Sequence, residues 1–453
     1  MPSKNTIFYG PSQTGKSYHT IIECMRILGS EYINPDKNYV YSADEYKKII
    51  NEFDLKRNLG DIEVIGFHES FSYAEFIEGS KLDLHDNNQI NITERSGCFK
   101  KFAQMALFEC IDVPKEKLVE IFSFKKIINY FKEVYPVSSI FQIESSFFEI
   151  INYTETAIII KPSSKSSFIE IKYDILKELI SKSINRQILG YEIKEILANE
   201  KGKTTFYYAI FTKLNEIINA AKITLINEFH KGAYNLKTSD VKPFVLVIEE
   251  IANCDISKVF GELISLLDED YREMRKVRLP YSYELFTLPN NLFIIGTITT
   301  PLKKSNIDNL ELLMRKFAMT YLTSNSNLVA DFGCDFSSIF EVLNTKISIL
   351  LGDEYQIGHG FFAKEKYENA DIDVLQDLWF KYVQPRLKLY FRNDMQKLQM
   401  LFGNATNTPN SFLKVKHTKM DLEPNNTNEY IHLVTSPDDD FNFKKALEYA
   451  FRM

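Results

Sequence analysis

The chain has 453 residues, of which 45% are hydrophobic and 25% charged, which is the composition of a globular protein with two to four structural units. Its net charge of −7 argues against a protein that coats nucleic acid by bulk positive charge, although a locally basic channel stays compatible with that average. The five cysteines form no CxxC pair, which predicts reduced thiols rather than disulfides or a zinc site.

The N-terminus enters a predicted strand within five residues, which leaves no room for a signal peptide. No apolar run approaches the roughly 18 residues of a membrane span. We therefore expect a cytoplasmic protein without a membrane partner.

The first predicted elements are a strand at 6–10, a loop, and an amphipathic helix at 17–29. The loop sequence "GPSQTGKS", residues 10–17, matches the pattern G-x-x-x-x-G-K-[ST] in full, and it stands between a strand and a helix, as the pattern requires. Gly10 and Gly15 let the backbone curl so that N–H groups point at phosphate oxygens, and the helix start adds its positive end.

The side chains of this loop suit a nucleotide bound with Mg²⁺. Lys16 reaches the β- and γ-phosphates, and the Ser17 hydroxyl can ligate the metal. We predict a nucleotide-binding site, with either GTP or ATP as substrate, formed by Gly10, Pro11, Ser12, Gln13, Thr14, Gly15, Lys16 and Ser17. A phosphate-binding motif does not decide between guanine and adenine.

Strands and helices alternate through residues 1–118, which predicts the first part of a parallel α/β core. Residues 119–228 interrupt that order with two or three strands, a Ser-rich turn and a long helix from 204 to 229, and we interpret them as an inserted α+β subdomain. Basic and aromatic residues on its strands suit contact with nucleic acid and equally suit a surface for a protein partner.

The α/β pattern resumes over residues 229–325. "FVLVIEEI" carries Glu249 and Glu250 to the end of an apolar strand, where the first acid positions Mg²⁺ and the second polarises the attacking water. The first acid is more often Asp in such sites. A helical stretch, "DISKVFGELISLLDEDY", then leads to a third strand, "NNLFIIGT", which is placed to carry a polar sensor.

Arg315 and Lys316 follow a helical stretch and are candidates for a finger that reaches a neighbouring subunit's γ-phosphate; the alternative is a solvated basic turn. Residues 326–402 are predicted to form a small helical unit. Residues 403–453 form a loop-rich extension that closes on a short helix.

With these residues placed, the sequence resembles the McrB family, the AAA+ motor subunits of modification-dependent restriction systems. The likeness covers roughly 1–118 and 240–402. It is carried by "GFHESFSYAEFIEG" (66–79), "GCFKKFAQMA" (97–106), "VLVIEEIANCDISKVFGELISLLDED" (245–270), "LPYSYELFTLPNNLFIIGT" (279–297), "DEYQIGHGFF" (353–362) and "VQPRLKLYFRND" (383–394).

The resemblance implies an AAA+ core with a C-terminal helical lid, and a ring-forming NTPase, typically a GTP-using hexamer. Such a ring works with a McrC-type nuclease and translocates DNA until cleavage occurs. Family members usually recognise DNA through a separate N-terminal domain; because the phosphate loop begins at residue 10, we expect that domain to be absent here. His359, in the lid segment "IGHGFF", either contacts nucleotide or is a packed or capping histidine.

The departures from the family pattern gather around the nucleotide. Ala252 and Asn253 stand where Asn and Arg are expected, and Met314 replaces one of two consecutive arginines. After the sensor strand, Thr299 stands for the signature Asn and Leu302 for its Asp. A threonine hydroxyl can still bond a phosphate or water, but it does not supply the donor and acceptor of an amide together.

Three hypotheses follow. The first is an active motor in which Lys16, Ser17, Glu249 and Glu250 bind and hydrolyse nucleotide; the presence of Glu250 favours it. The second is a degenerate ring subunit that binds nucleotide with little hydrolysis. The third is an AAA+ ATPase that remodels a protein, against which the lid and the 66–79 segment count.

Overall fold

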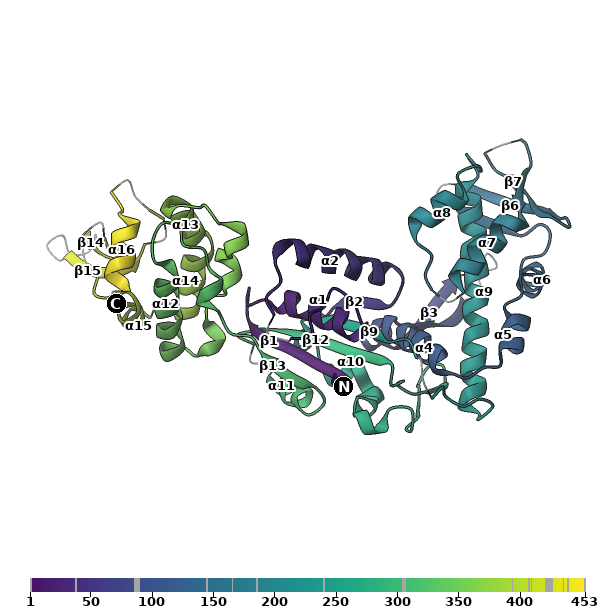
Figure 1. Ribbon diagram of the computed structural model, residues 1–453, viewed down its shortest axis with the longest axis horizontal. Coiled ribbons are helices and arrows are strands. Elements are labelled where there is room, and N and C mark those ends of the chain that lie inside the picture. Colours follow the sequence, from purple (N-terminus) through teal and green to yellow (C-terminus); the bar gives the residue numbers. More distant parts are fainter. Residues whose placement is uncertain are drawn as a thin grey trace. The chain divides into compact units, whose positions relative to one another are not determined.

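The computed structural model describes residues 2–451 apart from 37–38, 85–89, 144–145, 165, 185, 239–240, 304–306, 393, 406–407, 409, 420–426, 435 and 438–439. The fold is mixed α/β, with a central sheet flanked by helices (Figure 1). Among these residues no helix is both long and apolar enough to cross a membrane. All five cysteines are free thiols.

The central sheet has five strands in the order β13–β1–β12–β9–β2. Their bounds are β13 Ala318–Tyr321, β1 Asn5–Pro11, β12 Leu292–Thr300, β9 Phe244–Glu249 and β2 Ile62–Gly66. The pairings of β1 with β13, of β12 with β9 and of β2 with β9 are parallel. Strands of a parallel sheet are covered on both faces, which is why β9 and β12 are almost continuously apolar and buried.

The chain forms two compact units. The first comprises residues 1–5, 21–296 and 315–317, and the second comprises residues 6–20, 297–314 and 318–453. The five-part division expected from the sequence, 1–118, 119–228, 229–325, 326–402 and 403–453, stays a prediction.

In the first unit, α2 (Ala43–Asn58) packs Ile49 and Phe53 inward, and its start has a capping box between Ser42 and Glu45. The helical stretch expected over 255–271 consists of α10 (Ile256–Phe260) followed by 3₁₀ turns at Gly261–Leu266 and Glu269–Tyr271. The break falls at Gly261, whose φ of 52° ends the helix and which lies beside the Tyr73 ring.

A hairpin of β3 (Glu78–Leu84) and β4 (Ile90–Ser96) stands between α3 (Tyr73–Phe76) and α4 (Cys98–Cys110). Its base is fixed by Lys100, whose side chain is 1% exposed. The Lys100 ammonium lies 2.8 Å from Glu78, 2.7 Å from Glu94 and 2.8 Å from Glu284. Glu284 lies in the turn between two short antiparallel strands, β10 (Val277–Arg278) and β11 (Leu285–Phe286).

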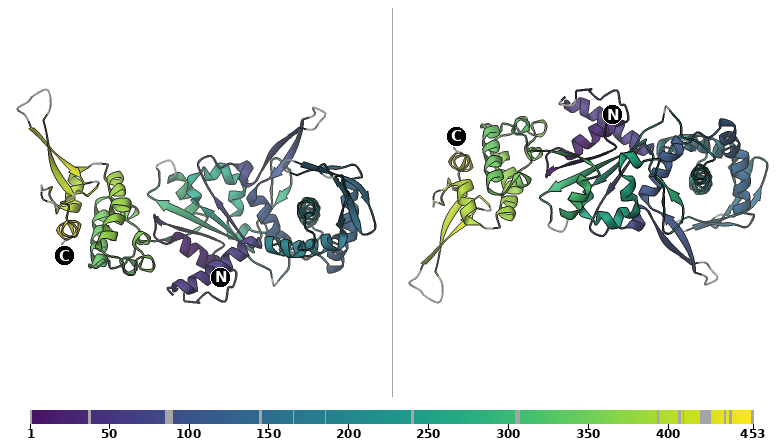
Figure 2. Two further views of the ribbon diagram at one scale, coloured as in Figure 1. Left: turned by 90° about the horizontal axis from the view of Figure 1, so that it is seen from above. Right: turned by 90° about the horizontal axis from the view of Figure 1, so that it is seen from below.

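The segment expected to be an insertion, 119–228, overlaps α5 (Lys115–Ile121), contains α6 (Phe124–Val134), α7 (Tyr173–Ser183) and α8 (Gly190–Ile196), and reaches into the long α9 (Thr204–His230). Its antiparallel sheet has four strands rather than the two or three expected: β5 (Ile140–Ile143), β6 (Ser146–Tyr153), β7 (Ala157–Pro162) and β8 (Ile169–Lys172). The sheet shares a hydrophobic core with α6, α7 and α9, and Figure 2 views α9 nearly end-on within this segment.

The second unit holds the helices α12 (Phe336–Leu350), α13 (Ile372–Leu378), α14 (Gln384–Phe391) and α15 (Met395–Phe402), with a π-helical turn at Trp379–Val383. The C-terminal β14 (Leu413–Lys419), β15 (Thr427–Leu433) and α16 (Phe443–Ala450) share one hydrophobic core with these helices. Trp379, fully buried, stacks on Phe412 and meets Phe443 edge-on. The C-terminal segment thus completes the helical unit.

Candidate functional site

The 10–17 turn joins the end of β1 to the start of α1 (Lys16–Ile27). Gly10 has a φ of 152°, and a Cβ there would lie 2.2 Å from the carbonyl oxygen of Leu322, so no side chain fits. Gly15 has a φ of 88°, and Gln13 between them also adopts a left-handed backbone at φ 64°. These backbone conformations produce the curled loop that the sequence predicted.

Two side chains stabilise the turn from inside. The Thr14 hydroxyl, in a side chain that is 2% exposed, donates to the Pro11 carbonyl at 2.8 Å. The Lys16 ammonium donates to the carbonyls of Gly10 at 3.0 Å and Pro11 at 2.7 Å, which holds its charge over the loop. Ser17 is exposed one residue into the helix. The arrangement offers a cation, backbone N–H groups and a helix N-terminus at one place, which suits a polyanion.

The loop at 357–360, hereafter the lid loop, packs directly on the 10–17 turn. The Gly360 N–H donates to the Gln13 carbonyl at 3.0 Å. A Cβ on Gly358 would lie 2.1 Å from the Ser12 carbonyl oxygen, so the two backbones meet at a distance that only glycine allows. The sequence did not foresee this contact, although the glycines on either side of His359 were its signal.

Asn344, in α12, fixes the lid loop. Its carboxamide accepts from the Ile357 N–H at 2.7 Å and donates to the Ile357 carbonyl at 3.1 Å. The Ser324 hydroxyl donates to that same carbonyl at 2.7 Å. Sequence reasoning missed both residues, because neither belongs to a recognised motif.

His359 is held in its neutral form. Its Nδ1 accepts the Asn325 N–H at 3.2 Å, which places the ring proton on Nε2. Burial, with a smaller contribution from nearby His19, lowers the pKa of His359, and Glu365 opposes the shift weakly. The ring therefore has a positioning contact with the backbone, as the packed or capping alternative expects; contact with nucleotide stays a prediction.

In the first unit, Glu249 is the exposed last residue of β9, and its carbonyl accepts the Phe67 N–H at 2.9 Å. Glu250 follows with φ 53° and ψ 46°, a left-handed conformation that is uncommon for a residue with a side chain. Such backbone strain is frequent at functional sites. Ala252, at the position where the family keeps Asn, is 1% exposed and belongs to the core.

Thr299 lies near the end of β12, where burial gives way to partial exposure. The neighbouring Thr300 donates its hydroxyl to the Glu354 carbonyl at 3.2 Å, so the strand end is tied to the segment that leads into the lid loop. Thr299 has interactions of its own and is half-buried.

The two residues of the candidate finger differ in environment. Arg315 is exposed, whereas the Lys316 ammonium is ion-paired with Asp268 at 2.6 Å. Of the two, Arg315 is the more exposed.

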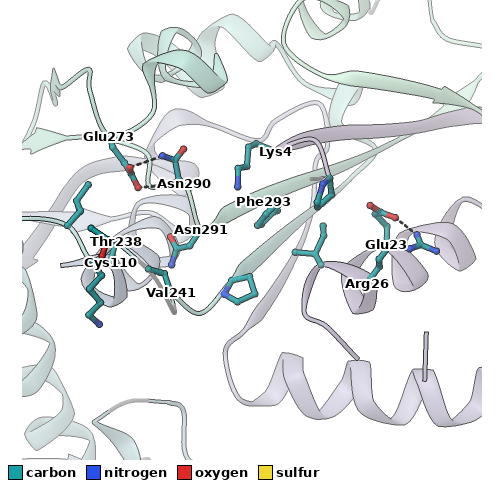
Figure 3. Close-up of a pocket in the computed structure, with 15 residues that line it drawn as sticks. Lys4, Glu23, Arg26, Cys110, Thr238, Val241, Glu273, Asn290, Asn291 and Phe293 are labelled. Atoms are coloured by element: carbon teal, nitrogen blue, oxygen red, sulfur yellow. Dashed lines mark hydrogen bonds and ion pairs between the residues drawn. The ribbon is translucent and has the colours of Figure 1, made fainter. Parts of the chain in front are cut away.

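A cavity in the first unit does not include this site. Its volume is about 860 Å³, and it is lined in part by Lys4, Arg26, Cys110, Asn291 and Phe293 (Figure 3). It contains none of the residues predicted for nucleotide or metal. Across the described residues no cluster of three or more His, Cys, Asp or Glu side chains is arranged to hold a metal.

Two comparisons with known proteins found similarities to this chain. The family model described as "McrB, alpha-helical lid domain" matches residues 335–399. The chain is 28% identical over 192 residues to the "Type IV methyl-directed restriction enzyme EcoKMcrB subunit" of Escherichia coli (strain K12), a match that covers 38% of this chain. The matched region spans 42% of that relative's length. On both comparisons, the chain is similar to McrB proteins over these matched regions.

Proposed function

We propose that the chain is a McrB-like nucleoside triphosphatase of the AAA+ class, which works in a ring with a McrC-type nuclease during restriction of DNA. The observation that carries this proposal is the curled 10–17 turn, with Lys16 held over it and the lid loop packed on its backbone. The name of the Escherichia coli relative, a restriction enzyme subunit, supports the biological setting. GTP is the substrate we expect, with ATP as the alternative.

In this proposal the 10–17 turn binds the phosphates. Backbone N–H groups of the turn and the start of α1 face the phosphate oxygens, while Lys16 exchanges its contacts with two carbonyls for contacts with phosphate. The side chains are suited to this because the cation and the donors come from one rigid strand–turn–helix segment.

Mg²⁺ fits the available ligands. Ser17 and Glu249 offer an exposed hydroxyl and an exposed carboxylate, both hard oxygen donors. Mg²⁺ usually takes only one or two protein ligands and completes its shell with water and phosphate oxygens. When bound, Mg²⁺ neutralises charge on the phosphates.

Glu250 is the residue we propose to polarise the attacking water. Its left-handed backbone follows directly after the end of β9, which directs it differently from a continued strand. In the sheet order β12 lies between β1 and β9, and β12 pairs with β9 in parallel. In parallel sheets, ligands bind outside the carboxyl ends of the strands.

A second candidate is a ring subunit that binds nucleotide and hydrolyses it slowly or not at all. The replacement of the family's sensor Asn and Asp by Thr299 and Leu302 favours it. A leucine supplies no charge or hydrogen bond, and a threonine supplies one hydroxyl where the amide supplies a donor and an acceptor.

For the ring, we propose that Arg315 acts on the nucleotide of the adjacent subunit. Arg315 is exposed, and the resemblance implies a hexamer. DNA would be engaged by the complex as a whole.

Turnover separates the two candidates. Purified protein is given GTP or ATP with Mg²⁺, alone and with a McrC-type nuclease, beside the Lys16→Ala and Glu250→Gln variants. The proposed function expects phosphate release that both substitutions abolish. Turnover no greater than that of Glu250→Gln under every condition would reject the active motor in favour of the slow or inactive ring.

A further inference from the structure

A cluster of polar side chains lies directly beneath the chain that carries Arg315. It consists of Asn5, Asp268, Arg272 and Lys316, hereafter the Asn5 cluster, and all four residues belong to the first compact unit. Asn5 and Arg272 are 1% and 2% exposed. Nothing in the proposed chemistry of the nucleotide site uses them directly.

Asn5 joins three segments of the chain through its carboxamide. The Nδ2 group donates to the Leu267 carbonyl at 2.6 Å and to the Lys316 carbonyl at 3.0 Å. Oδ1 accepts from the Arg272 guanidinium at 2.7 Å. Both donors and the acceptor are thus engaged, so the side chain fixes the mutual positions of all three partners.

Arg272 extends this network to the start of β12. Its Nη1 donates to the Pro289 carbonyl at 3.2 Å and to the Leu292 carbonyl. A guanidinium buried among neutral oxygens is costly compared with an apolar side chain of similar size. Directional hydrogen bonds to three acceptors on two separate segments are what such a residue adds over apolar packing.

Two acidic residues next to members of the Asn5 cluster form further hydrogen bonds. The Lys4 N–H donates to the Glu269 carboxylate at 2.7 Å, next to Asp268 in the chain. Glu273, next to Arg272, accepts from the Asn290 N–H at 2.8 Å and from its side-chain amide at 2.7 Å, contacts drawn in Figure 3.

The chain at 315–317 is fixed at two of its three residues. Lys316 is held by its carbonyl, which Asn5 contacts, and by its ammonium, which lies 2.6 Å from Asp268. Phe317 is 5% exposed in the core. Arg315, immediately before them, is exposed, so the fixed residues determine where its side chain starts.

We propose that Asn5, Arg272 and the Asp268–Lys316 ion pair are positioning residues, which set the direction of Arg315 so that its guanidinium meets the nucleotide bound by an adjacent subunit. This inference rests on the proposed function. It assigns Lys316, which the sequence suggested as a second finger residue, to the support of Arg315. Loss of this support should reduce turnover, while the 10–17 turn of the same subunit still binds nucleotide.

The test uses mixed rings. Lys316→Met removes the ammonium and keeps the length of the side chain, and Asn5→Asp keeps the acceptor for Arg272 while removing both donors. Arg315→Ala is the reference. Lys213→Met is the control, because Lys213 has an exposed ion pair with Glu216 in α9. Each variant is assayed for nucleotide turnover alone and after co-expression with Lys16→Ala, and its thermal midpoint is recorded.

We expect Lys316→Met and Asn5→Asp, each alone, to lose turnover at least about tenfold, like Arg315→Ala, with KM unchanged. In a mixed ring, the Lys16→Ala subunits keep Arg315 and the residues that support it. They can therefore act on nucleotide bound by the intact 10–17 turn of an adjacent variant subunit. In a random one-to-one ring about one quarter of the sites have both, so turnover should return to about that fraction of wild type. Lys213→Met should match wild type.

Two results overturn the positioning role. One is wild-type turnover in Lys316→Met and Asn5→Asp when Arg315→Ala is inactive. The other is a loss that co-expression fails to restore, although it restores Arg315→Ala, because that pattern marks general damage to the fold. If Arg315→Ala itself turns over at the wild-type rate, or wild type does not turn over at all, the proposed function fails first and the positioning role fails with it.

Discussion

The Gly360 N–H donates a hydrogen bond to the Gln13 carbonyl at 3.0 Å, and this contact joins the lid loop to the centre of the 10–17 turn. The two residues lie far apart in the chain, in a motif and in a lid segment that sequence patterns treat separately. Because the lid loop contacts the backbone of the turn, a change in the lid loop should alter the binding of any phosphate there.

Gly358→Ala should weaken nucleotide binding. Its Cβ would lie 2.1 Å from the Ser12 carbonyl, so the turn or the lid loop has to shift. We expect the Kd for a non-hydrolysable nucleotide to rise about tenfold or more, equivalent to about 1.4 kcal/mol. Gly190→Ala is the matched control, because a Cβ at Gly190 meets no atom within 4 Å. Equal affinity of the two variants, measured by calorimetric titration, would contradict the close approach.

Thr299→Ala should lower kcat and leave KM nearly unchanged. A hydroxyl at the end of β12 that bonds the reacting water or γ-phosphate in the transition state contributes to kcat more than to ground-state binding. Thr299→Asn, which restores the family's amide, should give at least the wild-type kcat. Steady-state kinetics on both variants check this, and unchanged kcat in Thr299→Ala would remove Thr299 from the sensor role.

Lys100→Met should destabilise the first unit by about 3–5 kcal/mol, because it leaves the buried Glu78 carboxylate without its counter-charge, together with the partly exposed carboxylates of Glu94 and Glu284. Burial alone would raise the pKa of Glu78, but hydrogen bonds from Lys100, Ser282 and Tyr281 outweigh it, and the pKa is lowered. The exposed neighbour Lys101→Met is the control. Denaturant unfolding compares them, and equal stability of the two variants would show that Lys100 is not the fixing point of the hairpin.

His230 should make stability depend on pH. Burial lowers its pKa from 6.5 to about 4, with Lys276 adding to the shift. Between these values the unfolded chain binds a proton that the folded protein does not, so stability is full above about pH 6.5 and falls as pH decreases. The loss is up to about 3 kcal/mol.

Thermal midpoints of wild type and His230→Gln between pH 7 and pH 5 test this. The wild-type midpoint should fall more steeply over that interval, since the variant has no proton to take up at this position. Parallel curves would mean that His230 titrates alike in both states.

The sequence predicted the elements whose chemistry is written in short motifs. The 10–17 turn, the acids at the end of β9, β12 and the long α9 lie where the residue patterns indicated. Each depends on the spacing of residues that are close together in the sequence, either glycines and a lysine or apolar residues. Such spacing can be read without knowing the tertiary contacts.

The parts that the sequence did not predict depend on contacts between distant residues. Lys100 forms ion pairs with acids from three separate segments. The strand β5 is only four residues long, which is too short for a clear residue pattern. The hairpin strand β3, "EGSKLDL", lacks an apolar run that would mark it. Asn344 and the Asn5 cluster act through backbone carbonyls and N–H groups, for which no residue pattern gives a signal.

The most direct test of the account is nucleotide binding itself. Wild type and Lys16→Ala are titrated by calorimetry with non-hydrolysable GTP and ATP analogues in the presence of Mg²⁺. The account predicts saturable binding by wild type and a loss of about tenfold or more in Lys16→Ala, whose thermal midpoint without nucleotide stays near that of wild type. Equal binding by the two proteins, or no binding of either analogue by wild type, would contradict the assignment of the 10–17 turn as the nucleotide site.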